Sequence, residues 1–96
     1  RGTIVLSVLS QLNEPTYGYN LVNKLAENGI KVEANTLYPL LRRLESQGLL
    51  VSTWETSGAK PRKYYAKTEK GKEIFVALKK YWDGMISNIN NLWEVK

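Results

Sequence analysis

The side chains of this chain with the clearest chemistry are basic, and they gather in two places. Arg42 and Arg43 are adjacent, and six of the thirteen residues from Lys60 to Lys72 are Lys or Arg while one is acidic. Guanidinium and ammonium groups at this density bind anions, and the guanidinium fork matches phosphate and carboxylate geometry. The formal net charge of +5 points the same way, because a basic chain attracts nucleic acid or another polyanion.

The residues on which most enzymes rely are missing or scattered. The chain has no cysteine and no histidine, which excludes disulfides, thiolate metal sites and the commonest general base. None of its nine carboxylates belongs to a recognisable catalytic pair, and neither a glycine-rich phosphate loop nor a G-x-S-x-G motif occurs. We therefore expect no enzymatic activity, no metal site and no cofactor.

The length and composition fit one small domain. Ninety-six residues, 43% of them hydrophobic, bury only about 60% of the surface of the unfolded chain, so we expect help from a partner subunit. No apolar run approaches the roughly 20 residues of a membrane span, and residues 1–10 do not resemble a signal peptide. We expect a soluble, cytoplasmic protein. Because the chain begins at Arg1 and not at methionine, we also expect a few residues to precede it.

The elements that must present the basic side chains begin with two helices. Apolar residues at helical spacing predict the first over residues 4–12, before Pro15, since proline disfavours the helical conformation in the residue that precedes it. The second is predicted over residues 17–28, with Thr16 as its N-terminal cap and Gly29 just past its end.

A third helix is predicted over residues 34–48, and it carries the two adjacent arginines. Only a brief segment separates it from the second helix, so the pair suits a helix-turn-helix. The apolar residues that recur at helical spacing and form its inner face are Leu37, Leu40, Leu41 and Leu44.

Past the third helix, the period of the pattern changes from helix to strand. Residues 49–55 and 62–67 are β-rich and partly alternating, and residues 56–61 between them are turn formers. They predict a two-stranded wing that holds most of the basic run. The predicted fold class is mainly α with a small β-wing: a winged helix-turn-helix DNA-binding domain over residues 1–67, then one long dimerisation helix over residues 68–96.

The last helix, predicted from Thr68 to about Trp93, has more apolar surface than one small domain can cover. A helix that is apolar over so wide an arc must be covered on both sides. We expect the chain's own core to cover one stripe and the same helix of a second subunit to cover the other, and so we predict a homodimer. The first stripe consists of Ile74, Leu78, Tyr81, Met85 and Leu92, and the second, the predicted dimer contact, of Phe75, Trp82, Ile86, Ile89 and Trp93.

Most of these features also have a plain structural explanation. Arginines at a helix end complement the helix dipole by a few tenths of a kcal/mol up to about 1 kcal/mol, and Pro39 could be only a helix starter. Tyr38 could simply pack between helices. Tyr64 and Tyr65 alternate, so at most one of them faces the sheet interior. The basic run could be a solvated face, but its place in the wing of a helix-turn-helix favours anion binding.

Four short motifs occur in a fixed order along the chain. Residues 17–19 read Y-G-Y, residues 36–49 read T-L-Y-P-x-L-x-R-L-E-x-x-G-L, residues 62–65 read R-K-Y-Y and residues 68–71 read T-x-x-G. In order and spacing they resemble the motifs of PadR-type bacterial transcriptional regulators. The resemblance covers almost the whole chain, over residues 2–93.

The resemblance implies a dimeric winged-helix repressor that binds an inverted-repeat operator. The short C-terminal part is similar to the smaller subfamily that includes the lactococcal multidrug-binding regulator, in which a tryptophan of the last helix stacks on planar aromatic or drug-like ligands at the dimer centre. Trp82 falls at the matching place, although it could equally be an ordinary dimer-core aromatic. The implied ligand-binding residues are Trp82, Leu6, Thr3, Lys79 and Ile86, of which Lys79 and Ile86 depart from the subfamily's pattern.

Together these elements predict how the chain holds a double-stranded DNA operator. The third helix would enter a major groove, and the wing would neutralise phosphates or reach the minor groove. Two subunits would read a pseudo-palindrome with half-sites roughly 10 base pairs apart. The alternatives are a winged-helix module that binds an acidic protein and a DNA-binding protein that no ligand controls. The predicted DNA-binding residues are Tyr17, Asn35, Thr36, Tyr38, Pro39, Arg42, Arg43, Lys60, Arg62, Lys63 and Tyr64.

Overall fold

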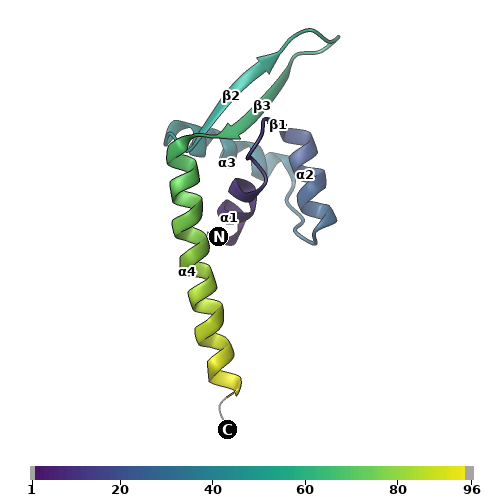
Figure 1. The fold of residues 1–96 in the computed structure, drawn as a ribbon. Coiled ribbons are helices and arrows are strands. Elements are labelled where there is room, and N and C mark those ends of the chain that lie inside the picture. Colours follow the sequence, from purple (N-terminus) through teal and green to yellow (C-terminus); the bar gives the residue numbers. More distant parts are fainter. Residues whose placement is uncertain (1, 95–96) are drawn as a thin grey trace.

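The computed structural model of the chain describes residues 2–94, in which four helices accompany one small antiparallel sheet (Figure 1). Three helices cluster below the sheet, and the last leaves this cluster as a single long rod. The predicted fold class is confirmed. The elements are α1 (Gly2–Ser10), β1 (Thr16–Tyr17), α2 (Gly18–Glu27), α3 (Ala34–Ser46), β2 (Leu50–Glu55), β3 (Arg62–Lys67) and α4 (Glu69–Glu94).

Leucines spaced for a helical stripe form the centre of the core. All four leucines that were predicted to form the inner face of α3 are buried. Each side chain of this kind contributes about 1.5–3 kcal/mol when it is fully removed from water. The rest of the core comes from α1 and the turn after it, from α2, from the segments before and after α3, and from β2 and β3. It consists of Val8, Leu9, Leu12, Leu21, Leu25, Val32, Leu49, Leu50 and Tyr65.

The sheet has three strands and not the two that were predicted. Its order is β1-β3-β2, and both pairs are antiparallel. The additional strand, β1, has only two residues, and Thr16 and Tyr17 pair with Tyr65 and Tyr64. So short a strand has no periodicity that a sequence pattern can reveal.

The same strand overturns the predicted cap of α2. Tyr17 occupies the N-cap position without a side-chain hydrogen bond, whereas Thr16 lies in β1. The Thr16 hydroxyl instead donates a hydrogen bond of 2.9 Å to the Glu14 carbonyl. Pairing with β3 therefore decides the conformation at the start of α2.

Thr68, the predicted first residue of the last helix, caps α4 and joins the end of α3 to the start of α4. Thr68 Oγ1 accepts a hydrogen bond from the Gly71 amide at 3.0 Å and donates one to the Gly48 carbonyl at 2.6 Å. Gly48 ends α3 with φ of 81°, a left-handed conformation that favours glycine. Gly71 lies so close to the Leu49 carbonyl that any side chain would collide with it. These contacts fix the direction in which α4 leaves the domain.

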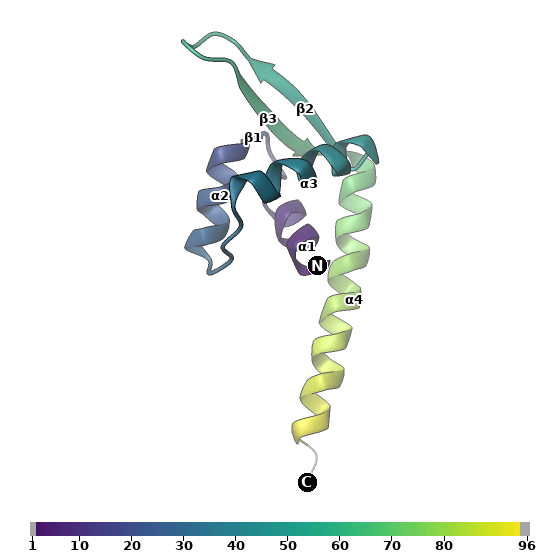
Figure 2. The same cartoon turned by 180° about the vertical axis from the view of Figure 1, so that it is seen from behind.

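Only the first part of α4 packs against the rest of the chain. Ile74, Phe75 and Leu78 pack against the core, whereas the C-terminal part of α4 projects alone (Figure 1 and Figure 2). The prediction that the chain's own core covers the whole first stripe is wrong, because Tyr81 is 66% exposed and Leu92 is 76% exposed. The reason is length. The helix α4 has 26 residues and spans about 39 Å, whereas its neighbour α1 has nine residues.

Candidate nucleic-acid interface

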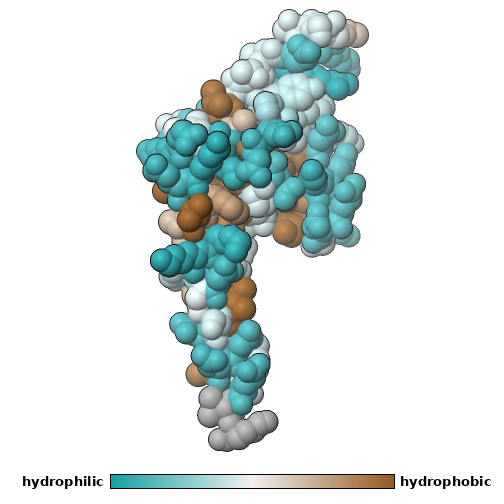
Figure 3. Space-filling model, in the orientation of Figure 1, coloured by the Kyte–Doolittle hydropathy of each residue, from teal (hydrophilic) through white to brown (hydrophobic). Residues whose placement is uncertain are grey.

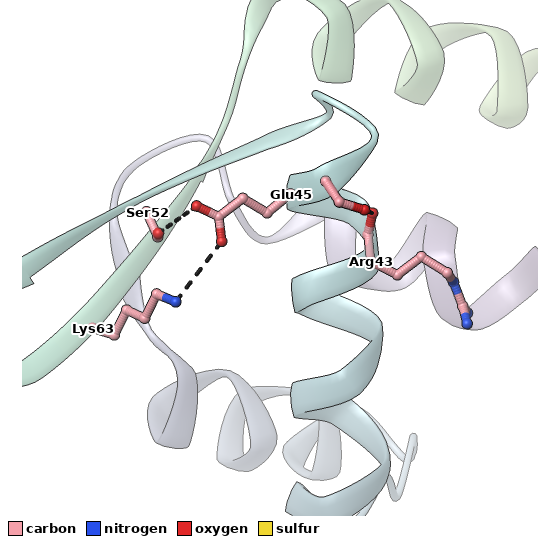
Figure 4. A network of polar contacts seen from close by, with 5 residues as sticks. Arg43, Glu45, Ser52 and Lys63 are labelled. Carbon is pink, nitrogen blue, oxygen red and sulfur yellow. Dashed lines mark hydrogen bonds and ion pairs between the residues drawn. The ribbon is translucent and has the colours of Figure 1, made fainter.

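The outer face of α3 is polar and exposed. Because successive residues of a helix are about 100° apart, Asn35, Pro39 and Arg42 lie on the side opposite the buried leucines, and all three are exposed. Arg43 leaves the helix on a different side, away from Glu45 (Figure 4). The adjacent arginines therefore do not act at one point; each could reach a different anion.

A hollow of about 480 Å³ separates α3 from α1. It has an apolar floor and brings together four of the predicted DNA-binding residues on the edge of α3 that faces α1. No sequence pattern pointed to this hollow, because the α1 residues that line it, Ile4 and Val5, follow the same helical stripe as the core. Its lining consists of Ile4, Val5, Asn35, Thr36, Pro39, Leu40 and Arg43.

Tyr38 is half-buried on the opposite edge of α3, where α3 crosses α2. A Cβ atom placed on Gly18 would lie 2.6 Å from Tyr38 Cε1, so the glycine makes room for the ring. Burial raises the pKa of the Tyr38 hydroxyl, and the neighbouring Tyr17 and Tyr65 raise it further. Tyr38 therefore packs between helices, as one of the two interpretations of the sequence proposed. This packing leaves open which groups its hydroxyl contacts outside the chain.

One face of the wing gathers four of the predicted DNA-binding residues. The rings of Tyr17 and Tyr64 lie 5.8 Å apart, and Arg62 Cζ lies 5.0 Å from the centroid of the Tyr17 ring. With Lys60 they line a hollow of about 700 Å³ that extends to the wing tip. The short strand β1 makes this cluster possible, because it sets Tyr17 beside Tyr64.

Lys63 lies on the other face of the wing. Successive residues of a strand point to opposite faces, so Lys63 faces away from Arg62 and toward α3. Its Nζ lies 3.9 Å from Glu45 Oε1 (Figure 4), and it also lies over the rings of Trp54 and Tyr65 at 5.7 and 5.5 Å. The structure therefore does not bring Lys63 to the cluster that contains Arg62.

Lys67 shows that the basic run is not one continuous surface. This lysine is only 8% exposed, and its Nζ lies 4.2 Å from the centroid of the Phe75 ring. Burial lowers the pKa of the Lys67 ammonium, and the charge of Lys72 lowers it further. Lys67 joins β3 to α4 and is closed to a large anion.

Four cations of the interface have no ionic partner of their own. Within residues 2–94, the ion pairs involve Lys63, Lys72 and Lys79. The cations that are left available for an external anion at α3 and the wing are Arg42, Arg43, Lys60 and Arg62.

A smaller hollow, of about 280 Å³, lies between α1 and α4. It brings Leu6 and Trp82 together, two of the implied ligand-binding residues. The other three do not line it: Thr3 and Ile86 are exposed elsewhere, and Lys79 pairs with Asp83 at 2.8 Å. The complete lining is Leu6, Leu78, Tyr81, Trp82 and Met85.

The predicted dimer contacts fall into two groups along α4. Phe75 packs against the core of its own chain, and Trp82 is half-buried. Ile86, Ile89 and Trp93 are exposed, the last by 70%. Figure 3 shows apolar side chains on the surface of the projecting part of α4, among hydrophilic ones.

Sequence reasoning missed three residues that shape this interface. Gly18 admits the Tyr38 ring, Glu45 holds Lys63, and Trp54 lies beside the same lysine. The alternation along β3 was a usable signal for part of this, since it separates Lys63 from Arg62. The partner of Lys63 had no signal, because Glu45 belongs to another element.

Two further observations concern the part of the chain that the structure describes. No helix within residues 2–94 has the length and apolarity that crossing a bilayer requires. Over the same range, no three His, Cys, Asp or Glu side chains come together in a way that could hold a metal ion.

Comparison with known proteins identifies relatives over most of the chain. Residues 5–77 match the family model described as the Transcriptional regulator PadR-like family. The transcriptional regulator Rv3488 of Mycobacterium tuberculosis is 34% identical over 73 residues, which cover 75% of this chain and 68% of that protein.

Solved structures extend the likeness to the whole fold. A PadR family transcriptional regulator from Eggerthella lenta is 53% identical and superimposes with a TM-score of 0.92, covering 100% of this chain and 86% of that one. Bacillus subtilis PadR, solved in complex with operator DNA, is more distant. It is 21% identical, with a TM-score of 0.72, and covers 78% of this chain and 44% of that one, so it supports the fold alone.

Proposed function

This chain belongs to the PadR-like family of transcriptional regulators, which are not enzymes, and from that premise we propose that it represses transcription by binding a pseudo-palindromic DNA operator as a homodimer. The observation that carries the proposal is a set of four cations on two adjacent elements that have no ionic partner among residues 2–94. Arg42 and Arg43 extend from α3, and Lys60 and Arg62 extend from the wing.

The proposed DNA contacts divide between these two elements. The outer face of α3 enters a major groove, where Asn35 and Thr36 reach base edges and the arginines bind flanking phosphates. On the wing, Lys60 and Arg62 bind phosphates, and the Tyr17 and Tyr64 hydroxyls donate to the same backbone. Each neutralised phosphate releases a counterion, so operator affinity falls steeply with salt.

The proposed division of labour is a DNA-binding unit over residues 1–67 and a dimerisation helix over residues 68–96. What supports the second is exposure. Ile86, Ile89 and Trp93 are exposed by 43, 38 and 70%, and the same helix of a second subunit can cover them. The dimer then presents two copies of α3 to half-sites about one helical turn apart.

We further propose that a planar aromatic ligand at the dimer centre releases the operator. The hollow between α1 and α4 supports this, because Trp82 offers a stacking surface beside Leu6. A ligand there would change the tilt between the two DNA-binding units, which must fit two half-sites at once. By reciprocity, operator DNA must weaken ligand binding by the same factor. Such a regulator acts in the cytoplasm, where bacterial operators lie.

The proposal is tested by selecting from a DNA pool. The purified protein is titrated into randomised duplex DNA at near-physiological salt, and the retained fragments are sequenced. Enrichment of an inverted repeat is the expected result. Retention without any enriched motif would contradict sequence-specific repression, and would turn attention to non-specific DNA binding or to a protein partner of the wing.

A further inference from the structure

We infer that Glu45 is a positioning residue for DNA binding: it locks the wing against α3 and holds Lys63 away from phosphates. The inference rests on the proposed function, because it concerns how the same interface is aligned. It assigns Lys63 a role different from that of Lys60 and Arg62, although all three belong to one basic run.

The Glu45 carboxylate bridges the recognition helix to both strands of the wing. Oε2 accepts a hydrogen bond of 2.6 Å from Ser52 Oγ on β2, and Oε1 lies 3.9 Å from Lys63 Nζ on β3 (Figure 4). The hydrogen bond is short and involves a charged acceptor, which makes it one of the stronger kinds. A single side chain therefore ties α3 to both strands of the hairpin.

The surroundings of Lys63 hold its ammonium group on the inner face of the wing. Its side chain is 30% exposed, and that of Glu45 is 33% exposed. Trp54, its partner across the hairpin, and Tyr65 offer their rings to the same ammonium group. To bind a phosphate, Lys63 would have to leave a carboxylate and two rings.

The position of this lock gives it leverage over the wing tip. Ser52 and Lys63 lie along the strands, whereas residues 56–61, which form the turn, extend beyond them. A small change of angle at Ser52 therefore moves Lys60 at the tip by more. Loss of the Glu45 contacts should leave the cations at the wing tip less precisely positioned. It should also free Lys63 to bind phosphate without sequence preference.

The first arm of the test needs no DNA. In Glu45→Gln the amide oxygen can still accept from Ser52, but the attraction for Lys63 is lost. Trypsin cleaves after Arg62 and Lys63, and we expect this cleavage to be about two- to fivefold faster in the variant, the factor expected when one partly exposed ion pair is lost and cleavage follows local opening. Glu73→Gln, which removes one exposed negative charge from α4, is the control and should match the wild type.

The second arm measures how operator affinity depends on salt. In Glu45→Gln the plot of log affinity against log salt should steepen by about 0.9, the increment for one additional phosphate contact, and the preference for operator over random DNA should fall. Lys63→Gln, at a partly exposed site where folding is not at risk, should leave the slope unchanged in the wild-type background. In the Glu45→Gln background it should restore the original slope.

The outcomes separate this inference from the proposed function. If the wild type enriches no operator, the proposed function fails, while the cleavage arm still tests the lock. If the wild type binds its operator and Lys63→Gln alone lowers the slope by about 0.9, Lys63 contacts phosphate already and the inference is wrong. Equal cleavage rates in Glu45→Gln and the wild type would overturn it as well.

Discussion

The winged helix of residues 2–67 and the projecting helix α4 treat their apolar side chains in opposite ways. In the winged helix, leucines such as Leu37 and Leu41 are fully buried, and α1, α2, α3 and the sheet cover one another. In α4, burial ends about halfway along the helix, and Leu92 and Trp93 are more than two-thirds exposed. The difference teaches that the core of the first region forms within one chain, whereas the exposed end of α4 is the surface on which the proposed partner subunit would pack.

The largest effect is expected from placing charges on the exposed apolar end of α4, where the proposed partner subunit would pack. We expect Ile86→Glu combined with Ile89→Glu to give a monomer by analytical ultracentrifugation, because two buried carboxylates cannot be accommodated at an apolar interface. Operator affinity should fall roughly a hundredfold or more, as simultaneous engagement of two half-sites is lost.

A matched pair of substitutions controls for the added charge. Ser87→Glu combined with Asn91→Glu adds the same two carboxylates to exposed positions on the polar side of α4, and it should leave the dimer intact. If the isoleucine variant also stayed dimeric, Ile86 and Ile89 would not form the dimer contact. The exposed apolar residues of α4 would then need a different explanation.

The same contrast explains how far the sequence alone could reach. The helices were predictable because their signal is local: Leu37, Leu40, Leu41 and Leu44 recur at a spacing that only a helix satisfies on one face. The strand β1 was not predictable, since two residues carry no period and their conformation depends on β3, far along the chain. The prediction that the chain's own core covers the first stripe of α4 failed for a related reason. Periodicity reveals an apolar stripe but not the length of the surface that packs against it.

The candidate interface was predictable in its elements but not in its faces. The basic run correctly predicted a cationic wing, yet Arg62, Lys63 and Lys67 have three different environments. Arg62 contacts Tyr17, Lys63 faces Glu45, and Lys67 is buried against Phe75. The pairing of β1 with β3 and the packing of α3 and α4 on the sheet determine these environments. Both depend on contacts between elements that are far apart in the sequence.

The next largest effect, a loss of stability, is expected from adding volume to the winged helix. Gly18→Ala would place a methyl group against the ring of Tyr38, which is half-buried where α2 and α3 cross. We expect a loss of about 1–3 kcal/mol in the free energy of unfolding, measured by urea denaturation. The prediction fails if the variant matches the wild type, because the crossing would then have room to spare.

A smaller effect is expected at the seam between the two regions, where Lys67 links β3 to α4. Its pKa is lowered by burial from the ordinary 10.5, so between the folded and the unfolded pKa the unfolded state binds more protons, and stability rises with pH in that window. Lys67→Met keeps the volume and should change stability at neutral pH by less than about 1.5 kcal/mol.

The pH dependence of stability tests whether the Lys67 ammonium is buried. Unfolding midpoints measured from pH 7 to 10.5 should rise more steeply for the wild type than for Lys67→Met. Parallel curves would mean that the ammonium is solvated, and that the seam is looser than its 8% exposure indicates.

The smallest effect, and the one opposite in sign, is expected in the middle of α4. An added methyl group at Gly84 would meet nothing within 4 Å, and replacing a mid-helix glycine by alanine favours the helix by roughly 0.5–1 kcal/mol. In a chain on its own, Gly84→Ala should therefore be stabilising, whereas Gly18→Ala is expected to be destabilising because its methyl group would meet Tyr38. This follows only if the surface at Gly84 stays open. Urea denaturation at several protein concentrations separates the cases. Stabilisation that is independent of concentration leaves Gly84 outside the dimer contact, whereas destabilisation that grows as the protein is diluted would mean that the partner's helix comes close to the glycine.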